Sequence, residues 1–324
     1  MFVKDLDITE FRGIKRSKKK IDFSNFTVLI GKNNSGKSSI LEALSLLPAS
    51  QVRDIITDRT KSQLLEDLNK GRKGYSSFLY LHAGISDLKY HLSDNRILEM
   101  KFDMDNNSNL ILDNSPIIDS IEHIAKAYRI NKNQLSKLVL FIPNNTKIIE
   151  EIELKIKSLK DLIMKKGVHI TVAEFINKCV DDKYSELVFQ DSISIRKIFS
   201  KNTFYLPLND LGTGIEKIVK IMSLVEVIEP KLILIDDFES GLHPSLIELF
   251  IEWLKNGKWQ TIISTHSIDV LNSIIDSNPP DTSVLLLKKD SEDILNYEKF
   301  ELDKLTAYMN SNADPRYLVD TFDL

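Results

Sequence analysis

The sequence is poor in cysteine, glycine and proline, and it contains no long hydrophobic run. Its 324 residues include one cysteine, Cys179, which excludes an intramolecular disulfide and a zinc site built of thiolates. Glycine and proline number 11 and 9, about half the average usage, which excludes collagen-like and low-complexity chains. The longest apolar stretches, such as residues 138–142, are far too short to cross a bilayer, and the first residues lack the apolar core of a secretory signal. We therefore expect a soluble, cytoplasmic protein with no membrane partner.

Neither sign of charge dominates the composition. Lysine and arginine number 43 against 47 aspartates and glutamates, so the net charge of −4 does not favour nucleic acid as a partner. The shares of hydrophobic residues (42%) and charged residues (28%) are typical of a globular chain. The local exception is KRSKKK at 15–20, which we interpret as a solvated hairpin tip, with contact to a phosphate backbone as the alternative.

Both terminal thirds alternate strand-like and helix-like patterns. The strand-like segments are almost continuously apolar, as strands covered on both faces are. The alternation predicts a mainly parallel sheet covered by helices. The predicted strands are 2–8, 21–30, 186–190, 193–199, 203–206, 232–235 and 260–264, and the predicted helices are 38–47, 214–228, 244–255 and 267–275.

Residues 50–185 form a less regular middle third, in which short apolar runs alternate with polar loops and helix-like segments. Apolar residues spaced by three and four predict one amphipathic helix over 146–166, ended by Gly167. The segment TVAE at 171–174 is typical of a capping box that opens a further helix. We therefore predict one domain over 1–324, with 50–185 as an inserted, mainly helical lobe.

The strongest motif is GKNNSGKSS at 31–39, which fits the phosphate-binding pattern G-x-x-x-x-G-K-[ST] between a strand and a helix. About 0.005 such matches are expected by chance in a chain of this composition. Glycines let backbone N–H groups close around phosphate oxygens, Lys37 would reach the β- and γ-phosphates, and Ser38 would ligate Mg²⁺. The candidate nucleotide-binding residues here are Gly31, Asn33, Asn34, Ser35, Gly36, Lys37, Ser38 and Ser39.

A second motif, LILIDD at 232–237, is an apolar strand that ends in two carboxylates. After a phosphate-binding loop, such a strand typically delivers an acid that holds a Mg²⁺-bound water. Asp236 is therefore a candidate metal residue. Asp237, one residue on, is a candidate general base for the attacking water.

Two further segments complete the pattern. LGTGIEKI at 211–218 precedes a helix, and it offers the Thr213 hydroxyl and the N–H of Gly214 at a positive helix end. TIISTHS at 261–267 is a strand that delivers His266 at its carboxyl end, where ligands collect in open α/β sheets.

With these residues the sequence resembles the ABC-class ATPases of the SMC-like branch, and most closely the ATPase half of the OLD (overcoming lysogenisation defect) family and its AAA relatives. The resemblance covers roughly 1–50 and 200–275. It rests on FRGI at 11–14, GKNNSGKSS at 31–39, LGTGIEKI at 211–218, LILIDDFESGLHP at 232–244 and STHS at 264–267.

The resemblance implies an α/β fold, the P-loop NTPase of ABC-ATPase head type, in which an antiparallel β portion and a helical lobe join the parallel sheet. It also implies a homodimer that closes around ATP and Mg²⁺. Lys37 and Ser38 of one subunit and Thr213 and Gly214 of the other would then contact the same nucleotide. Arg12 would contact nucleotide, His266 would sense the γ-phosphate, and SGLH at 240–243 would cross the dimer interface.

Three departures from the family pattern carry their own predictions. Asp237 stands where a glutamate is usual, and a carboxylate that reaches about 1.5 Å less far predicts slow hydrolysis. The glutamine that normally links Mg²⁺ to the helical lobe is unassigned, with Gln63, Gln134 and Gln190 as candidates. The residues after His266 are too few for a TOPRIM nuclease, so we expect none in this chain and a separate nuclease or effector as partner.

The preferred hypothesis is a dimeric ATPase that couples closure to DNA or to a DNA-processing partner, in repair, chromosome maintenance or defence. The first alternative is a nucleotide-gated binding module with little hydrolysis. The second is a transporter ATPase subunit, which the long separation of Lys37 from Gly214 disfavours.

Overall fold

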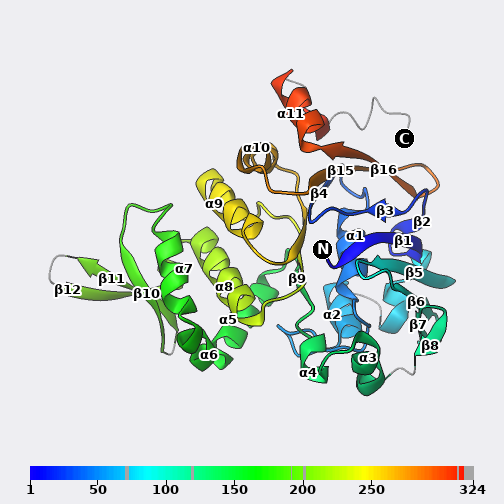
Figure 1. Cartoon of the computed structure of the whole chain (residues 1–324), viewed down its shortest axis with the longest axis horizontal. Coiled ribbons are helices and arrows are strands. Elements are labelled where there is room, and N and C mark those ends of the chain that lie inside the picture. The colour runs from blue at the N-terminus through cyan, green and yellow to red at the C-terminus, as the bar shows by residue number, and fades with distance from the viewer. Residues whose placement is uncertain (70–72, 118–119, 191, 200–201, 312–313, 317–324) are drawn as a thin grey trace.

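The protein is built around one large mixed sheet (Figure 1). The computed structural model describes residues 1–69, 73–117, 120–190, 192–199, 202–311 and 314–316. The strands of the sheet lie in the order β8 (Ser115–Ile117), β7 (Ser108–Leu112), β6 (Ile97–Asp103), β5 (Ile85–Leu92), β1 (Val3–Phe11), β2 (Ile14–Ser17), β16 (Ile294–Glu301), β15 (Thr282–Lys289), β4 (Phe26–Gly31), β14 (Gln260–Ser264), β13 (Leu232–Ile235) and β9 (Val139–Ile142), with β3 (Ile21–Asp22) beside β1.

The half of the sheet from β15 to β9 is parallel throughout. Every residue of β4, β9, β13 and β14 is buried, because helices cover both faces of this half. The carboxyl ends of these strands therefore meet along one edge of the sheet, where ligands collect in such folds.

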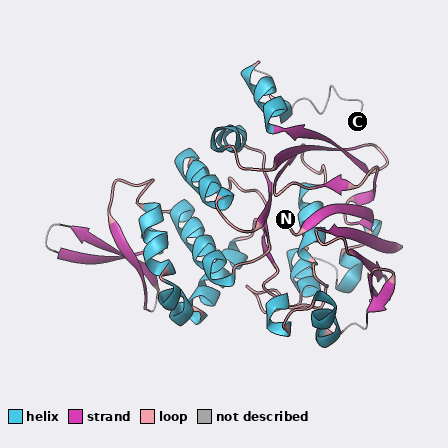
Figure 2. Cartoon of the chain, in the orientation of Figure 1, coloured by secondary structure: helices cyan, strands magenta, loops and turns pink. Residues whose placement is uncertain are grey.

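The other half of the sheet is mainly antiparallel, from β8 through β5 to β1. In β5 and β6 buried residues alternate with partly exposed ones, so one face packs on the core and the other faces solvent. Figure 2 shows this half as a group of strands away from most of the helices.

The alternation of side chains along the parallel strands makes two separate cores. Leu232 and Leu234 of β13 face the first core, together with the helix that follows β4, whereas Ile233 and Ile235 face the second. The helices are α1 (Lys37–Ser45) on the first face, and α8 (Thr213–Ile228), α9 (Pro244–Lys255) and α10 (Ile268–Ser277) on the second.

A helical lobe with its own small sheet packs on α8 and extends away from the main sheet (Figure 1). Its antiparallel strands precede a short helical turn that leads directly into α8. The lobe consists of α5 (Thr146–Ser158), α6 (Lys160–Lys166), α7 (Val168–Ile176), β10 (Tyr184–Phe189), β11 (Ile193–Phe199), β12 (Asn202–Pro207) and the turn η3 (Leu208–Leu211).

The remaining helical elements pack around the antiparallel half and the last strands. In the described part of the chain, no helix has the length and apolar character needed to span a bilayer. These elements are α2 (Lys61–Leu68), η1 (Gly74–Ser77), η2 (Tyr80–His82), α3 (Ile121–Tyr128), α4 (Lys132–Leu135) and α11 (Leu302–Asn310).

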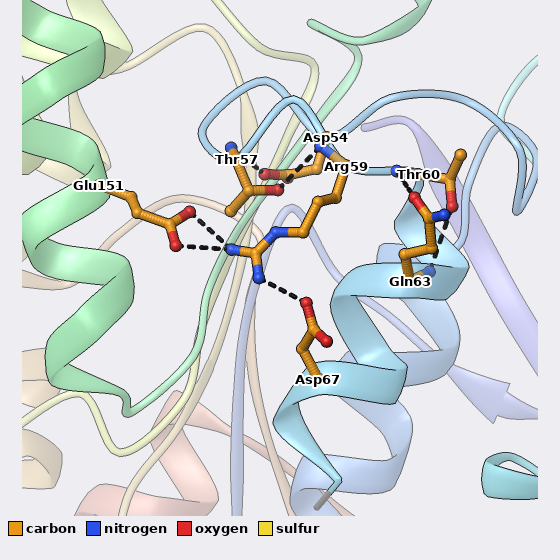
Figure 3. Close-up of polar contacts among 7 residues, drawn as sticks. All are labelled: Asp54, Thr57, Arg59, Thr60, Gln63, Asp67 and Glu151. Atoms are coloured by element: carbon orange, nitrogen blue, oxygen red, sulfur yellow. Dashed lines mark hydrogen bonds and ion pairs between the residues drawn. The ribbon is translucent and has the colours of Figure 1, made fainter. Parts of the chain in front are cut away.

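Arg59 joins the lobe to the body of the protein (Figure 3). Its guanidinium donates to both carboxylate oxygens of Glu151 on α5, at 2.7 and 2.6 Å, and to Asp67 on α2 at 2.5 Å. Asp54 accepts the N–H of Thr57 at 2.9 Å, which holds the loop that carries Arg59. The loop, α2 and α5 are thereby tied together through one side chain.

The predicted fold class is confirmed: parallel strands, an antiparallel β portion and a helical lobe are all present. Residues 50–185 do not form one inserted lobe: β5–β8 extend the sheet, β9 forms its opposite edge, α2, η1, η2, α3 and α4 pack beside the antiparallel half, and only the part from α5 onward belongs to the lobe. The prediction of one helix over 146–166 is wrong, since the helix breaks at Leu159. The predicted capping box at 171–174 is also wrong: Gly167, in the left-handed conformation, ends α6 and starts α7 directly.

Candidate nucleotide-binding site

The phosphate-binding loop lies between β4 and α1, at the carboxyl edge of the sheet. The Lys37 side chain is folded back over the loop, where its Nζ donates to the carbonyls of Gly31 at 2.9 Å and Lys32 at 3.1 Å. Burial lowers the pKa of Lys37, and the charges of Asp237 and Asp236 oppose that shift. The ammonium is therefore held against the loop by two carbonyl oxygens that a phosphate could replace.

The loop needs glycine where its backbone turns most sharply. Gly36, the residue before α1, has φ 101°, which favours glycine. A Cβ on Gly31 would lie 2.6 Å from the backbone oxygen of Leu287. The Ser35 hydroxyl beside it is buried and has no hydrogen-bond partner among the described residues, which fits a loop that acquires further polar contacts from a ligand.

The other predicted residues belong to the loop itself or, like Ser38 and Ser39, to the first turn of α1. Asn33, Asn34 and Ser38 are exposed, and Ser39 is half-buried. Asn34 has φ 62°, a conformation that asparagine tolerates better than most residues.

Asp236 lies at the carboxyl end of β13, beside the start of α1. Its Oδ1 accepts a hydrogen bond from Ser264 Oγ at 2.5 Å, and Ser38 also hydrogen-bonds to this carboxylate. Burial raises the pKa of Asp236, and the hydrogen bonds from Ser264 and Ser38 oppose the shift. Three neighbouring elements therefore converge on one carboxylate.

The oxygen atoms of Ser38 and Asp236 fit Mg²⁺, which binds carboxylate, hydroxyl and phosphate oxygens. Across the described ranges there is no group of three or more His, Cys, Asp or Glu side chains that could hold a metal ion alone. Mg²⁺ usually takes one or two protein ligands and completes its shell with waters and phosphate, so this small set of oxygens is sufficient.

Asp237 follows in the left-handed conformation, with φ 46°. Its N–H donates to Ser264 Oγ at 2.8 Å, and its carboxylate accepts a hydrogen bond from Asn144 Nδ2 at 2.9 Å. Ser240 Oγ donates to Asn144 Oδ1 at 3.2 Å. Asp237 is thus directed toward the loop after β9.

Glu239 holds the segment after β14. Its carboxylate accepts hydrogen bonds from Thr265 Oγ1 and from the N–H of His266, both at 2.7 Å. The His266 side chain is exposed, and its carbonyl accepts a hydrogen bond from Arg316 at 2.6 Å. His266 therefore lies on the same edge as Asp236, two residues beyond Ser264.

Thr213 and Gly214 open α8 and lie against the segment 240–243. A Cβ on Gly214 would be 2.7 Å from the backbone oxygen of Gly241, so this close approach requires glycine. One turn further along α8, Lys217 Nζ donates to the carbonyl of Ser240 at 2.9 Å. Segment 240–243, which follows β13 and its two aspartates, therefore packs directly against the start of α8.

Arg12 is engaged elsewhere than in the loop. Its guanidinium donates to both oxygens of Glu42 on α1, at 2.5 and 2.9 Å, and to the carbonyl of Ser77 at 2.6 Å. A contact between Arg12 and nucleotide stays a prediction.

Asn144 is a candidate site residue that none of the sequence motifs indicated. It follows β9, the strand next to β13, and contacts the acidic motif and, through the next residues, α5 of the lobe. The three glutamines considered above lie in other settings: Gln63 (Figure 3) and Gln134 close the capping boxes of α2 and α4, and Gln190 follows β10. The signal available in the sequence was the apolar run 138–142 followed by two asparagines.

Comparison with known families gives two matches. The family described as "AAA domain, putative AbiEii toxin, Type IV TA system" matches residues 86–272. Residues 1–54 match a family described as a protein of unknown function (DUF2813).

Two curated relatives and one solved structure extend the comparison. An "ATP/GTP phosphatase" of Helicobacter pylori is 24% identical, over 90% of this chain and 94% of the relative. The Septu protein PtuA of Bacillus mycoides is 26% identical over 90% of this chain, which spans only 41% of that protein. The Smc head domain of Pyrococcus furiosus, solved with a bound C-terminal domain of ScpA, has the same fold, with a TM-score of 0.64 at 13% identity over 96% of this chain and 99% of that one. The fold of an SMC-like ATPase head, expected from the motifs, is therefore confirmed.

The packing of Lys217 predicts a pH-dependent stability. Burial lowers the pKa of Lys217 to about 8. Between pH 8 and the ordinary value of 10.5 the unfolded chain binds more protons at this site than the folded one, so the free energy of unfolding rises with pH across that window. In Lys217→Met this rise should be smaller by up to about 3 kcal/mol.

Urea unfolding of the native protein and of the Lys217→Met variant at pH 7.5 and pH 10 measures the difference. Lys160→Met, which changes an exposed lysine of α6, is the matched control and should keep the native pH dependence. An unchanged rise in Lys217→Met would contradict the assignment.

Proposed function

This chain belongs to the AAA domain family described as putative AbiEii toxin, Type IV TA system, and from this premise we propose that it is an ATPase that closes into a homodimer around ATP. The observation that carries the proposal is the convergence of Ser38, Asp236 and Ser264 beside Lys37 at the carboxyl edge of the parallel strands. The curated relative named "ATP/GTP phosphatase" supports a nucleoside triphosphate as substrate.

In this proposal Lys37 leaves the carbonyls of Gly31 and Lys32 and binds the β- and γ-phosphates, whose oxygens replace those acceptors. Ser38 and Asp236 hold Mg²⁺, which when bound supplies positive charge to the same phosphates. The backbone N–H groups of the loop and the N-terminus of α1 complete the phosphate cradle.

Asp237 orients and deprotonates the attacking water. The hydrogen bonds support this choice over Glu239. Asp237 is held by the Asn144 amide, whereas both oxygens of Glu239 accept hydrogen bonds from the segment after β14. Because the side chain of Asp237 is one methylene shorter than a glutamate, we expect slow turnover.

The dimer completes each site with the start of α8 from the partner. Support comes from the two cores: α1 packs on one face of the sheet and α8 on the other, so the loop of one chain and its own Thr213 belong to different layers. Thr213 and Gly214 then contact the γ-phosphate bound by the partner subunit, segment 240–243 lies in the interface, and His266 senses the same phosphate.

In this proposal Asn144 takes the role of the family's glutamine, the residue that normally links Mg²⁺ to the helical lobe. Its amide contacts Asp237, and residues 144–147 lead straight into α5 of the lobe. A phosphate or water that displaces this hydrogen bond would therefore move the loop that carries the lobe.

A nucleotide-gated binding module with little hydrolysis is the second candidate, and the short Asp237 side chain favours it. In both cases closure acts on a partner. We propose a separate effector protein, as the resemblance to the longer Septu protein PtuA suggests, and DNA through the exposed cations at 15–20.

Asp237 is the proposed general base. Asp237→Asn should lower ATP turnover at least about 100-fold, because it removes the group that accepts the proton of the attacking water. ATP binding should remain, and the mass in solution, measured by light scattering, should double when ATP is added.

Lys37→Ala is the control and should neither bind ATP nor dimerise. A monomer mass for ATP-bound Asp237→Asn would contradict the dimer. If the native protein binds ATP without turnover and Asp237→Glu gains none, the ATPase proposal fails and the binding module remains.

Asn144, the asparagine after β9, is proposed to orient Asp237. Asn144→Ala should lower turnover about tenfold, because Asp237 loses the donor that orients it. Asn144→Asp should also raise the pKa of the resulting carboxylate pair, so the acid limb of the pH–rate profile should shift to higher pH. Asn145→Ser, which keeps the N-cap of α5, is the neighbouring control and should show the native profile. A native pH profile in Asn144→Asp would refute this role.

The exposed cations at 15–20 are the proposed DNA contact. If the five cations at 15–20 contact phosphates, the logarithm of the binding constant should fall with the logarithm of salt with a slope of about −4.5. Fluorescence anisotropy with duplex DNA, with ATP present, measures the slope, and binding that is absent or indifferent to salt would remove DNA from the proposed partners.

A further inference from the structure

The segment after β14 is held on both sides of one residue, His266. Its N–H donates to Glu239 Oε1 at 2.7 Å, and its carbonyl accepts a hydrogen bond from Arg316 Nη1 at 2.6 Å. Because both backbone groups are engaged, the exposed imidazole can move only about its own side-chain torsions. The two hydrogen bonds therefore determine where the imidazole points at the carboxyl edge of the sheet.

Glu239 anchors the N–H side of this residue and belongs to the same edge. Its other carboxylate oxygen accepts a hydrogen bond from Thr265 Oγ1 at 2.7 Å, and the N–H of Thr265 donates to the carbonyl of Leu29 on β4 at 3.1 Å. Ser267 then forms the N-cap of α10. The N–H side of His266 is thus tied into the sheet, whereas its carbonyl side depends on a residue 50 positions further along the chain.

Arg316 is itself held in one orientation by Asp314. Its Nε donates to Asp314 Oδ1 at 2.9 Å and its Nη2 to Asp314 Oδ2 at 2.5 Å, while its backbone N–H donates to Asp314 Oδ1 at 2.9 Å. The hydrogen bond from Arg316 lowers the pKa of Asp314, so the carboxylate is charged at neutral pH. Because a guanidinium is planar, binding along its Nε and Nη2 side fixes the direction of Nη1, which here meets the carbonyl of His266.

The same ion pair disfavours direct contact between Arg316 and nucleotide. A phosphate that approached this guanidinium would also meet the negative charge of Asp314, which repels it. Arg316 is therefore suited to act on the site through the backbone of His266.

On this basis, and resting on the proposed function, we propose that Arg316 is a positioning residue for His266. It holds the carbonyl so that the imidazole reaches the γ-phosphate of bound ATP, and residues 314–316 thereby control closure and hydrolysis without contact to nucleotide. Without Arg316 the phosphate-binding loop stays intact, but the peptide after His266 gains freedom, and ordering it then opposes the contact with the γ-phosphate.

Turnover and ATP affinity of the full chain give the first test. Arg316→Ala should lower kcat about tenfold, the effect of losing one charge-assisted hydrogen bond, and leave the Kd for ATP within about twofold. Arg316→Lys keeps a donor for the carbonyl but loses the planar fork, so kcat should fall only about threefold. Lys304→Ala, which removes a partly exposed cation of α11 that pairs with Glu298, is the matched control and should show native values.

A double substitution with His266 gives the second test, in a measurement that needs no turnover. In the Asp237→Asn background, light scattering over a range of protein concentrations with saturating ATP gives the dissociation constant of the dimer. Arg316→Ala and His266→Ala should each raise this constant, and His266→Ala should raise it more. The double variant should match His266→Ala alone within about twofold, because Arg316 acts through that residue.

Three results would overturn this inference alone. The first is a native dimer dissociation constant in Arg316→Ala, and the second is a loss of ATP affinity in that variant, which would indicate direct contact with nucleotide. The third is a double variant in which the two effects add in full. Native protein that neither binds ATP nor dimerises would instead overturn the proposed function.

Discussion

The carboxylate of Asp236 is the contact on which the rest of the site depends. It receives Ser264 from the strand beside it and Ser38 from the first turn of α1, so β13, β14 and the phosphate-binding loop are held in one register. Ser264 also accepts the N–H of Asp237, which couples the orientation of the candidate base to the same hydroxyl. Burial raises the pKa of this carboxylate, and the hydrogen bonds from Ser264 and Ser38 and the charge of Lys37 offset only part of that shift.

The two-sided parallel sheet explains why a partner subunit is needed in the proposed mechanism. Because successive residues of β13 face opposite cores, α1 and α8 cover different faces of the sheet. Gly214 packs on Gly241 and Lys217 on Ser240, so the start of α8 is fixed to the loop that follows the acidic strand. Asn144 contacts Asp237 from a third loop, which leads to the lobe.

The sequence was sufficient for features that depend on local spacing. The loop at 31–39 lies between a strand and a helix as predicted, and the helices that follow β12, β13 and β14 begin within one residue of their predicted starts. The sequence was insufficient for the strands whose place in the sheet depends on pairing with segments far away in the chain. Strands β5 and β16 alternate buried and exposed residues with charges on the open face, so neither has the continuous apolar run of a buried strand. Asn144 is recognised as a candidate only when β9 and β13, far apart in the chain, lie side by side in the sheet.

The ion pairs of Arg59 limit how the lobe can move relative to the body of the protein. Its guanidinium links Glu151 on α5 with Asp67 on α2, and Lys155, one turn further along α5, pairs with Asp58 of the same loop. A rotation of α5 about the loop after β9 must therefore either break these ion pairs or pull α2 and the loop before it along. Since the pairs are partly exposed, salt screens them, and the stiffness of this connection between the lobe and the body is set by ionic strength as well as by packing.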